Sequence, residues 1–194
     1  MTNKNGDRIL CGFDPIFYQK GWLFVTFLYI AIIVVLVVLD QLSKYWAATT
    51  LLESGPIPLI RGVFEFHYTE NRGVAFSMLQ DQRWVFIPIS ILMTVLLILT
   101  LVRSPMRKNK WFCASVILVI AGAIGNLIDR ILLGYVIDFL YFSLIDFPIF
   151  NVADCFVVIG AILLFIFAMF GMKEYEELPL RTLLFNMRKR HKES

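Results

Sequence analysis

Long apolar runs, separated by short polar segments, dominate the pattern of this chain. Four of them are long enough to cross a bilayer, which takes about 20 mostly apolar residues. Aromatic and polar residues at their ends suit the membrane interface. We therefore predict transmembrane helices over about residues 22–46, 84–102, 111–133 and 150–172.

A different pattern follows the first span. Phe64, Phe66 and Tyr68 occupy alternate positions, the period of a strand. Asn71 and Gly73 come next and favour a turn, because both residue types tolerate left-handed backbone. We predict a small sheet on the membrane surface, with its apolar face toward the lipid or the helix bundle.

The loop before the last span predicts two further features. Its apolar stretch, residues 139–145, suggests a short amphipathic segment or lid that lies flat on the membrane. Asp146 and Pro148 together suggest the start of the next element, because Asp caps helices and Pro fits the first turn.

Composition and charge favour one membrane-embedded domain over residues 1–194. Hydrophobic residues make up 59% of the chain, against about 45–50% in soluble folds. Lys and Arg cluster between the second and third spans and again after the fourth, and such basic segments stay in the cytoplasm. This places residues 1–21, 103–110 and 173–194 inside, and loops 47–83 and 134–149 outside.

The cysteines and histidines indicate no metal site. Cys11, Cys113 and Cys155 are scattered, without metal-ligand spacing, and we interpret them as small apolar residues. His67 has no partner at metal spacing, and HExxH is absent. We therefore expect no cofactor.

Three carboxylates in the second outer segment suggest chemistry. Asp138, Asp146 and Asp154 lie within residues 134–155, which contain no Lys or Arg. Unpaired acids beside a bilayer are functional candidates, because ionised carboxylates are costly there. Asp138 follows the third span and Asp154 opens the fourth, so both lie at one membrane face. The short connection makes these spans neighbours, and the two carboxylates can approach each other.

Other polar residues lie at helical spacings near that face. Asp40 and Lys44 are four residues apart and can pair along one helix, although a simple ion pair at the end of a span has the same pattern. Gly122, Asn126 and Arg130 form a stripe along the third span. The small residues before it permit close helix packing, which is the alternative, purely structural interpretation. Asn151 shares a helix face with Asp154.

Two close carboxylates can work as an acid and a base. They cannot both ionise cheaply, so one pKa rises and the pair shares a proton. The ionised partner can activate water, and the protonated partner can stabilise an oxyanion. The pattern predicts peptide hydrolysis at the outer surface. The residues that would orient the pair or hold the substrate backbone are Asn71, Asn126, Asn151 and Arg130.

Five motifs carry a resemblance to a known family. They are DQLSK (40–44), NRGVAF (71–76), AGAIGNLIDR (121–130), VIDF (136–139) and FNVAD (150–154). In this order, over roughly residues 22–172, the chain resembles the bacterial lipoprotein signal peptidases, also called signal peptidase II.

The resemblance implies a fold and an activity. The fold would be an α-helical integral membrane protein with four transmembrane helices and a small extracytoplasmic β-sheet, the cradle, between helices 1 and 2. The activity would be an aspartic endopeptidase that cleaves prolipoproteins N-terminal to a diacylglyceryl cysteine. Its catalytic residues would be Asp138 and Asp154, whereas Asp129 would be structural. Supporting residues would be Asp40, Lys44, Asn71, Gly73, Asn126, Arg130 and Asn151.

The same resemblance implies surroundings and partners. We expect a monomer in the bacterial cytoplasmic (inner) membrane, with both termini in the cytoplasm and the active site at the outer face. Its partners would be prolipoproteins with a lipidated cysteine in the lipobox and membrane lipids, without nucleic acid or metal. Globomycin-type peptides would inhibit it. Residues 1–21 and the tail from Met172 fall outside the resemblance, and Asp146 matches no catalytic position.

Two rival functions fit part of the pattern. A small transporter also uses membrane carboxylates, but it would place them near the bilayer midplane in broken helices. A non-catalytic assembly factor would use these charges only to hold its helices together.

Overall fold

The computed structural model describes residues 15–73, 83–104, 106 and 109–171, with side chains from residue 24 in the first helix and from residue 87 in the second. Several residues used above lie outside this set. They are residues 1–14, which include Cys11, residues 74–76, residues 105 and 107–108 of the basic loop, and the tail from Met172.

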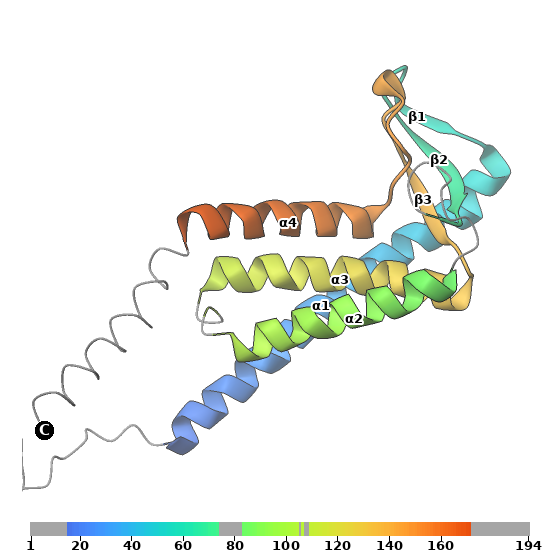
Figure 1. Cartoon of the computed structure of the whole chain (residues 1–194). Helices are drawn as coiled ribbons and strands as arrows, with labels where there is room; N and C mark the ends of the chain where they lie inside the picture. Colours follow the sequence, from blue (N-terminus) through green and yellow to red (C-terminus); the bar gives the residue numbers. More distant parts are fainter. Residues whose placement is uncertain (1–14, 74–82, 105, 107–108, 172–194) are drawn as a thin grey trace, which may run out of the picture.

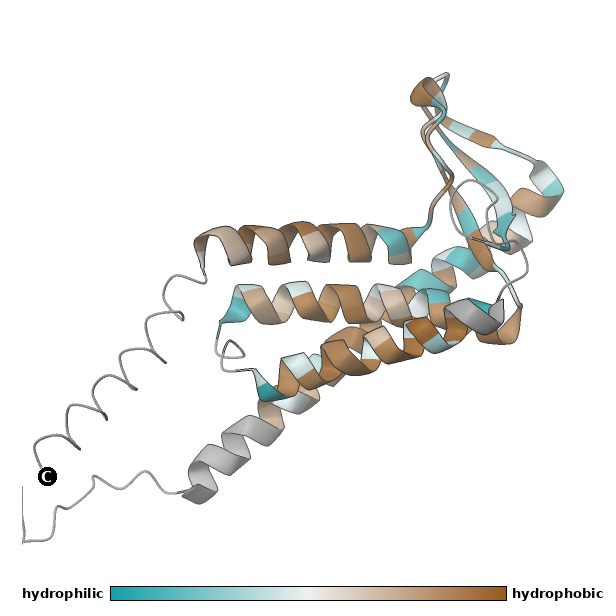
Figure 2. Ribbon diagram, in the orientation of Figure 1, coloured by the Kyte–Doolittle hydropathy of each residue, from teal (hydrophilic) through white to brown (hydrophobic). Residues whose placement is uncertain are grey.

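The described residues contain four α-helices: α1 (Pro15–Ser54), α2 (Arg83–Arg103), α3 (Lys110–Leu132) and α4 (Val152–Phe170). Within the described residues, α1, α3 and α4 are long and apolar enough to span a membrane, and α2 contributes a shorter apolar helix over Ile87–Arg103. Figure 1 shows α3 between α4 on one side and α1 and α2 on the other. Apolar residues dominate the helices, and polar ones gather where they meet the sheet (Figure 2).

Glycines allow α3 and α4 to pack closely. A side chain on Gly122 would collide with the Ala153 carbonyl oxygen, and one on Gly160 would come within 2.8 Å of the Ser115 carbonyl oxygen. Small residues at a helix interface permit this backbone approach. The close packing predicted from the small-residue stripe of the third span is therefore present.

A three-stranded antiparallel sheet covers one end of the helices (Figure 1). Its strands are β1 (Ile57–Ile60), β2 (Phe64–Asn71) and β3 (Val136–Tyr141), in the order β1-β2-β3. The strand expected from alternation is confirmed as β2. The third strand corrects the sequence analysis, which placed the sheet between the first two helices and expected a lid at 139–145. Instead, β3 comes from the loop between α3 and α4, and a short 3₁₀ helix, η3 (Ser143–Ile145), follows it.

The end of α1 supports this sheet. The sequence predicted that the first span ends near residue 46, but the helix continues to Ser54. Ala47 and Leu51 are buried there against Ile137 and Phe139 of β3. Packing against the sheet explains the longer helix, because the last turns of α1 gain an apolar partner in β3.

The start of α4 differs from its prediction as well. Asp146 does not cap the helix. It ends η3 in the left-handed conformation and accepts a hydrogen bond of 2.5 Å from the Tyr141 hydroxyl. The N-cap is Asn151, whose side chain accepts from the Asp154 N–H while the Asp154 carboxylate accepts from the Asn151 N–H. This reciprocal arrangement satisfies two N–H groups that the helix start leaves free.

Candidate active site

Asp138 lies in the middle of β3 with only 1% of its surface exposed. The side-chain amide of Asn71 on β2 donates to Asp138 Oδ2 at 2.9 Å. The side-chain amide of Asn151 donates to Asp138 Oδ1 at 2.6 Å. Antiparallel pairing sets this geometry, because Asn71 ends the strand that neighbours β3. Both oxygens of the carboxyl group are therefore held by uncharged amides.

Asp154 lies in the first turn of α4. Asn126 of α3 donates to Asp154 Oδ1 at 2.8 Å, and the Asn151 backbone N–H donates to Oδ2 at 3.1 Å. The helix cap therefore fixes the carboxylate on the side that faces α3.

Two asparagines connect Asp138 and Asp154. Asn151 donates to Asp138 through its side chain and to Asp154 through its backbone. Its side-chain amide also lies 3.1 Å from Asn126 Oδ1, and Asn126 in turn donates to Asp154. The two catalytic candidates are thus brought together through shared amide partners, as predicted from the neighbouring ends of the two helices.

A second group of polar side chains adjoins this pair through Asn126 and is called the lysine cluster here: Asp40, Gln41, Lys44 and Asp129. Lys44 Nζ is 2.9 Å from Asp40 Oδ2 and 2.9 Å from Asp129 Oδ2, and it donates to Asn126 Oδ1 at 2.9 Å. Lys44 is only 1% exposed. The Asp40–Lys44 pair predicted from spacing is present, but it is buried between helices and is not an exposed ion pair.

Gln41 is a member of the cluster that the sequence analysis did not select. Its amide donates to Asp129 Oδ1 at 2.9 Å and lies 3.2 Å from both Asp40 Oδ2 and the Gly125 carbonyl oxygen. Its place next to Asp40, inside the DQLSK motif, was the available signal. Gln41 holds α1 against α3.

The carboxylates of the lysine cluster also anchor backbone elements of the site. Asp129 Oδ2 accepts from the Ile137 N–H at 3.2 Å, one residue before Asp138. Asp40 Oδ1 accepts from the Ala153 N–H at 2.8 Å, one residue before Asp154. Each structural acid therefore fixes the backbone beside one member of the carboxyl pair.

The remaining predicted site residues surround the pair. Gly73 N–H donates to Asn71 Oδ1 at 3.1 Å, which turns the chain as it leaves β2. Arg130 lies on α3, within electrostatic reach of Asp154 and Asp138, and its guanidinium is 3.4 Å from the Asn126 carbonyl oxygen. Lys44 is a second cation that acts on Asp138.

The surroundings of Asp138 favour its neutral form. Burial is the main cause and raises the pKa of this carboxyl from 3.8 to about 7. The Asn71 hydrogen bond opposes the rise, the charge of Asp154 adds to it, and Asn151 and Lys44 oppose it. A carboxyl group with this pKa can hold or release a proton near neutral pH.

The fold and the site define a helical integral membrane protein with a buried pair of carboxyl groups suited to acid–base hydrolysis. A sequence model of the family described as Signal peptidase (SPase) II matches residues 32–170. The lipoprotein signal peptidase of Clostridioides difficile (strain 630) is 44% identical over 143 residues, which cover 74% of this chain and 95% of that protein. The corresponding protein of Streptococcus pyogenes serotype M1 is 42% identical and covers 72% and 91%. The chain therefore belongs to the signal peptidase II family and is a membrane peptidase.

Solved structures agree with this assignment. A bacterial membrane enzyme determined by the in meso method at 2.3 Å resolution has a TM-score of 0.69 and 32% identity, covering 77% of this chain and 92% of that one. A second such enzyme, at 1.9 Å resolution, has a TM-score of 0.66 and 34% identity, covering 73% and 92%. The resemblance inferred from the five motifs is confirmed.

Proposed function

We propose that this peptidase removes signal peptides from prolipoproteins, cleaving N-terminal to a diacylglyceryl cysteine, and that Asp138 and Asp154 activate the water. The observation that carries this proposal is the double contact of Asn151, which donates to both carboxyl groups. Because Asn151 contacts both carboxyl groups, it keeps them close enough to act on the same peptide bond. Family membership supports the choice of prolipoproteins.

The mechanism assigns one proton to the pair. Asp138, with its raised pKa, holds the proton, and Asp154 is the ionised base. Asp154 takes a proton from water as the water oxygen attacks the scissile carbonyl carbon, and Asp138 donates its proton to the carbonyl oxygen. As the C–N bond breaks, Asp154 protonates the leaving nitrogen and Asp138 recovers a proton from the hydroxyl group. Both carboxyl groups return to their starting states.

The amides around the pair keep the acid and the base in place. Asn71 and Asn151 hold both oxygens of Asp138, and Asn126 holds Asp154 while it accepts from Lys44. Lys44 therefore acts through Asn126 and does not neutralise either catalytic candidate by direct contact. Arg130 adds a positive charge that favours an oxyanion beside the pair. The mechanism uses two carboxyl groups and water, and it routes no step through a metal or cofactor.

The proposed setting is the bacterial cytoplasmic membrane. Arg103, Lys110 and the basic tail favour a cytoplasmic location for the loop between α2 and α3 and for both termini. The sheet and the carboxyl pair, at the other end of the helices, would then face outward. We propose that the enzyme acts there as a monomer, with lipid around its apolar helices.

The transporter alternative is not favoured. A carrier would have its carboxylates near the bilayer midplane, in interrupted helices. Here Asp154 opens α4 and Asp138 lies in a strand beyond the end of α3. The family assignment points to proteolysis as well.

Substitution of the two aspartates tests the proposal. Asp138→Asn and Asp154→Asn each remove an acid or a base, so prolipoprotein cleavage in proteoliposomes should fall by about 10²–10⁴-fold or more. Asp146→Asn is the matched control, because this exposed carboxylate accepts a hydrogen bond from Tyr141, which is not a residue of the site. Both variants should be recovered folded. Full cleavage by either one would refute the mechanism and leave the assembly-factor alternative.

Inhibitors give an independent test. Cleavage should stop with globomycin and continue with EDTA and with serine-reactive reagents. Loss of activity in EDTA that added metal restores would contradict the mechanism. The orientation is tested by cysteine labelling at position 108, which should be reached from the cytoplasmic side.

A further inference from the structure

Asn71 contacts Asp138 from the last position of its strand. Its side-chain amide donates to Asp138 Oδ2 at 2.9 Å, and its amide oxygen accepts from the Gly73 N–H at 3.1 Å. The pair that Asn71 forms with Val136 lies at the end of the β2–β3 ladder. The end of a strand opens more easily than its middle. The contact between Asn71 and Asp138 therefore depends on what holds this end of the sheet together.

Four side chains hold this end of the sheet, and they are called the tyrosine network here: Tyr68, Glu70, Arg72 and Tyr135. Two of them, Glu70 and Arg72, flank Asn71 in the chain, and side chains alternate between the two faces of a strand. Both tyrosines pack on the apolar cluster at the end of α1, which includes the two neighbours of Asp138 in β3. The network and the Asp138 carboxyl group therefore lie on opposite faces of the sheet.

The contacts within the network join β2 to the start of β3. Arg72 Nη2 is 2.8 Å from Glu70 Oε2, and the Arg72 guanidinium carbon lies 5.6 Å from the centre of the Tyr135 ring. The Tyr68 hydroxyl interacts with both Tyr135 and Glu70. A guanidinium group within about 6 Å of an aromatic ring is attracted to its face. Tyr135 directly precedes β3, whereas the other three members belong to β2 or follow it, so Tyr135 connects the two strands.

The Tyr135 ring makes this network more than a surface ion pair. The Arg72 side chain is 59% exposed and the Glu70 side chain is 35% exposed, and an exposed ion pair alone contributes little. The ring of Tyr135 is half-buried and packed on the cluster at the end of α1. It therefore gives the planar guanidinium group a fixed surface, and arginine is suited to such stacking.

We propose that Tyr135 is a positioning residue of the peptidase: through Arg72 and Glu70 it holds the end of β2 against β3, and it thereby keeps the Asn71 amide on Asp138. Because Tyr135 lies on the other face of the sheet, it acts through the backbone on both sides of Asn71. This inference rests on the proposed function, in which Asp138 holds the proton of the carboxyl pair.

Loss of this positioning should change the charge state of Asp138 in one direction. Burial raises the pKa of this carboxyl to about 7, and the hydrogen bond from Asn71 opposes the rise. The other groups that act on its charge are carried by α1, α3 and the start of α4, outside the tyrosine network: Lys44, Arg130, Asn151 and Asp154. A displaced Asn71 therefore raises the pKa of Asp138 further. The decline of cleavage above about pH 7 should then move to higher pH.

The pH profile of prolipoprotein cleavage in proteoliposomes tests the proposal. Asn71→Ala removes the amide, so kcat should fall about 10-fold to 100-fold and the decline should move to higher pH. Tyr135→Leu should lower kcat severalfold and move the decline in the same direction by less, with KM little changed. Arg72→Met removes both contacts of the guanidinium group and should reproduce this result. Tyr135→Phe keeps the ring beside Arg72 and should have a smaller effect than Tyr135→Leu.

A double variant distinguishes positioning of Asn71 from any other effect of Tyr135. In Asn71→Ala/Tyr135→Leu there is no amide left to position, so the decline should lie at the same pH as in Asn71→Ala alone. A further shift in the double variant would overturn the proposal. Unchanged pH profiles in both Tyr135→Leu and Arg72→Met would overturn it as well.

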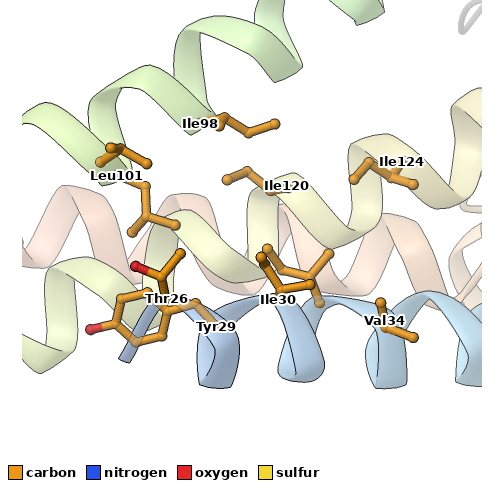
Figure 3. A pocket seen from close by; sticks show the side chains of 10 residues that line it. Thr26, Tyr29, Ile30, Val34, Ile98, Leu101, Ile120 and Ile124 are labelled. Carbon is orange, nitrogen blue, oxygen red and sulfur yellow. The ribbon is translucent and has the colours of Figure 1, made fainter. Parts of the chain in front are cut away.

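Two control variants test whether a general loss of stability moves the pH profile. Ile120→Val shortens a fully buried side chain of α3 in the apolar pocket between α1, α2 and α3, which no residue of the network lines (Figure 3). It should lower the free energy of unfolding and leave the profile in place. Tyr141→Phe removes a hydroxyl that bonds Asp146 at the other end of β3 and should also leave it in place. A shift in either control as large as that in Tyr135→Leu would contradict a specific role of Tyr135.

Unfolding in detergent separates this inference from the proposed function, because it needs no substrate. If the original protein cleaved no prolipoprotein, the proposed function would fail while this measurement still judged the positioning role. Stability falls as pH rises from the ordinary pKa of Asp138, 3.8, to its folded value of about 7. Asn71→Ala and Tyr135→Leu should both extend this fall to higher pH. A curve for Tyr135→Leu that ends its fall where the original protein does would overturn the inference.

Discussion

The lysine cluster and the carboxyl pair are two neighbouring buried sites that use acids in opposite ways. In the first, Asp40 and Asp129 each lie 2.9 Å from Lys44. In the second, Asp138 and Asp154 are held by the amides of Asn71, Asn126 and Asn151. Asn126 contacts both sites, because it accepts from Lys44 and donates to Asp154. The two sites therefore differ in the partner of the carboxyl groups, which is an ammonium group in the first site and amides in the second.

The difference teaches how a small membrane enzyme separates structure from chemistry. A carboxylate in contact with a buried ammonium group cannot take up a proton without leaving that cation unpaired. A carboxyl group held by amides keeps its position and can still change charge, because burial and a neighbouring acid bring its pKa near neutrality. The first arrangement fixes helices, and the second is available for proton transfer.

Lys44→Met should produce the largest loss of stability. It leaves Asp40 and Asp129 buried without their cation, which costs about 3–5 kcal/mol when one partner of a buried pair is removed. The free energy of unfolding in detergent measures the effect. The matched variant Asp40→Asn/Lys44→Met/Asp129→Asn removes all three charges and should recover most of the loss. A single variant as stable as the original protein would contradict the structural role of the cluster.

Asn151→Ala should weaken both the start of α4 and the carboxyl pair. It removes the N-cap of α4, worth about 0.5–2 kcal/mol, and the side-chain amide that donates to Asp138 and to Asn126. Asn151→Ser separates the two effects, because serine can cap a helix but is too short to replace the amide donor to Asp138. We expect the serine variant to keep most of the stability and to lose most of the cleavage activity. Full activity in the serine variant would show that the bridge is dispensable.

Gln41→Leu should have an intermediate effect on stability and activity, because Gln41 helps to connect the lysine cluster to the carboxyl pair. It removes the amide that holds Asp129, whose other oxygen fixes the backbone before Asp138. Unsatisfied buried acceptors cost about 1–3 kcal/mol. We expect kcat to fall more than KM rises, because Gln41 acts on the carboxyl pair through Asp129. Ser43→Ala is the control on the same helix, since its hydroxyl bonds only the Asp40 carbonyl oxygen of its own turn. Equal effects of both substitutions would contradict this role.

The pH dependence of stability should also distinguish the two regions. The pKa of Asp138 is about 7 in the folded protein and 3.8 as its ordinary value. Between these values the folded state holds a proton that the unfolded state has lost, so stability falls as pH rises through this window. Unfolding between pH 4 and 8 should show this slope, and Asp138→Asn should reduce it. Cleavage should decline above about pH 7, as Asp138 loses its proton. An unchanged slope in the variant would contradict the assignment.

Local patterns predicted the elements of this fold and much of the site. The helical segments, the strand at residues 64–68 and the Asp40–Lys44 spacing depend on periods of a few residues, which the sequence displays directly. The helix-start position of Asp154 and its shared face with Asn151 followed for the same reason. The prediction for Asp146 was wrong, because an Asp with Pro two residues later is only a local signal for a helix start. The two N–H groups of the helix start were satisfied by Asn151 and Asp154 instead.

The sequence by itself determined where the four helical segments lie, which acids lie at one end of the spans, and through its motifs the family. Only the tertiary structure decided that Lys44 is buried between Asp40 and Asp129, that Gln41 joins α1 to α3, and that residues 136–141 complete the sheet. These contacts join residues far apart in the chain, and they depend on how closely the helices pack. A side chain on Gly125 would meet the Asp40 carboxylate at 2.5 Å. The periodicity of the sequence cannot predict such a contact, because the contact depends on how closely a helix from a distant part of the chain packs.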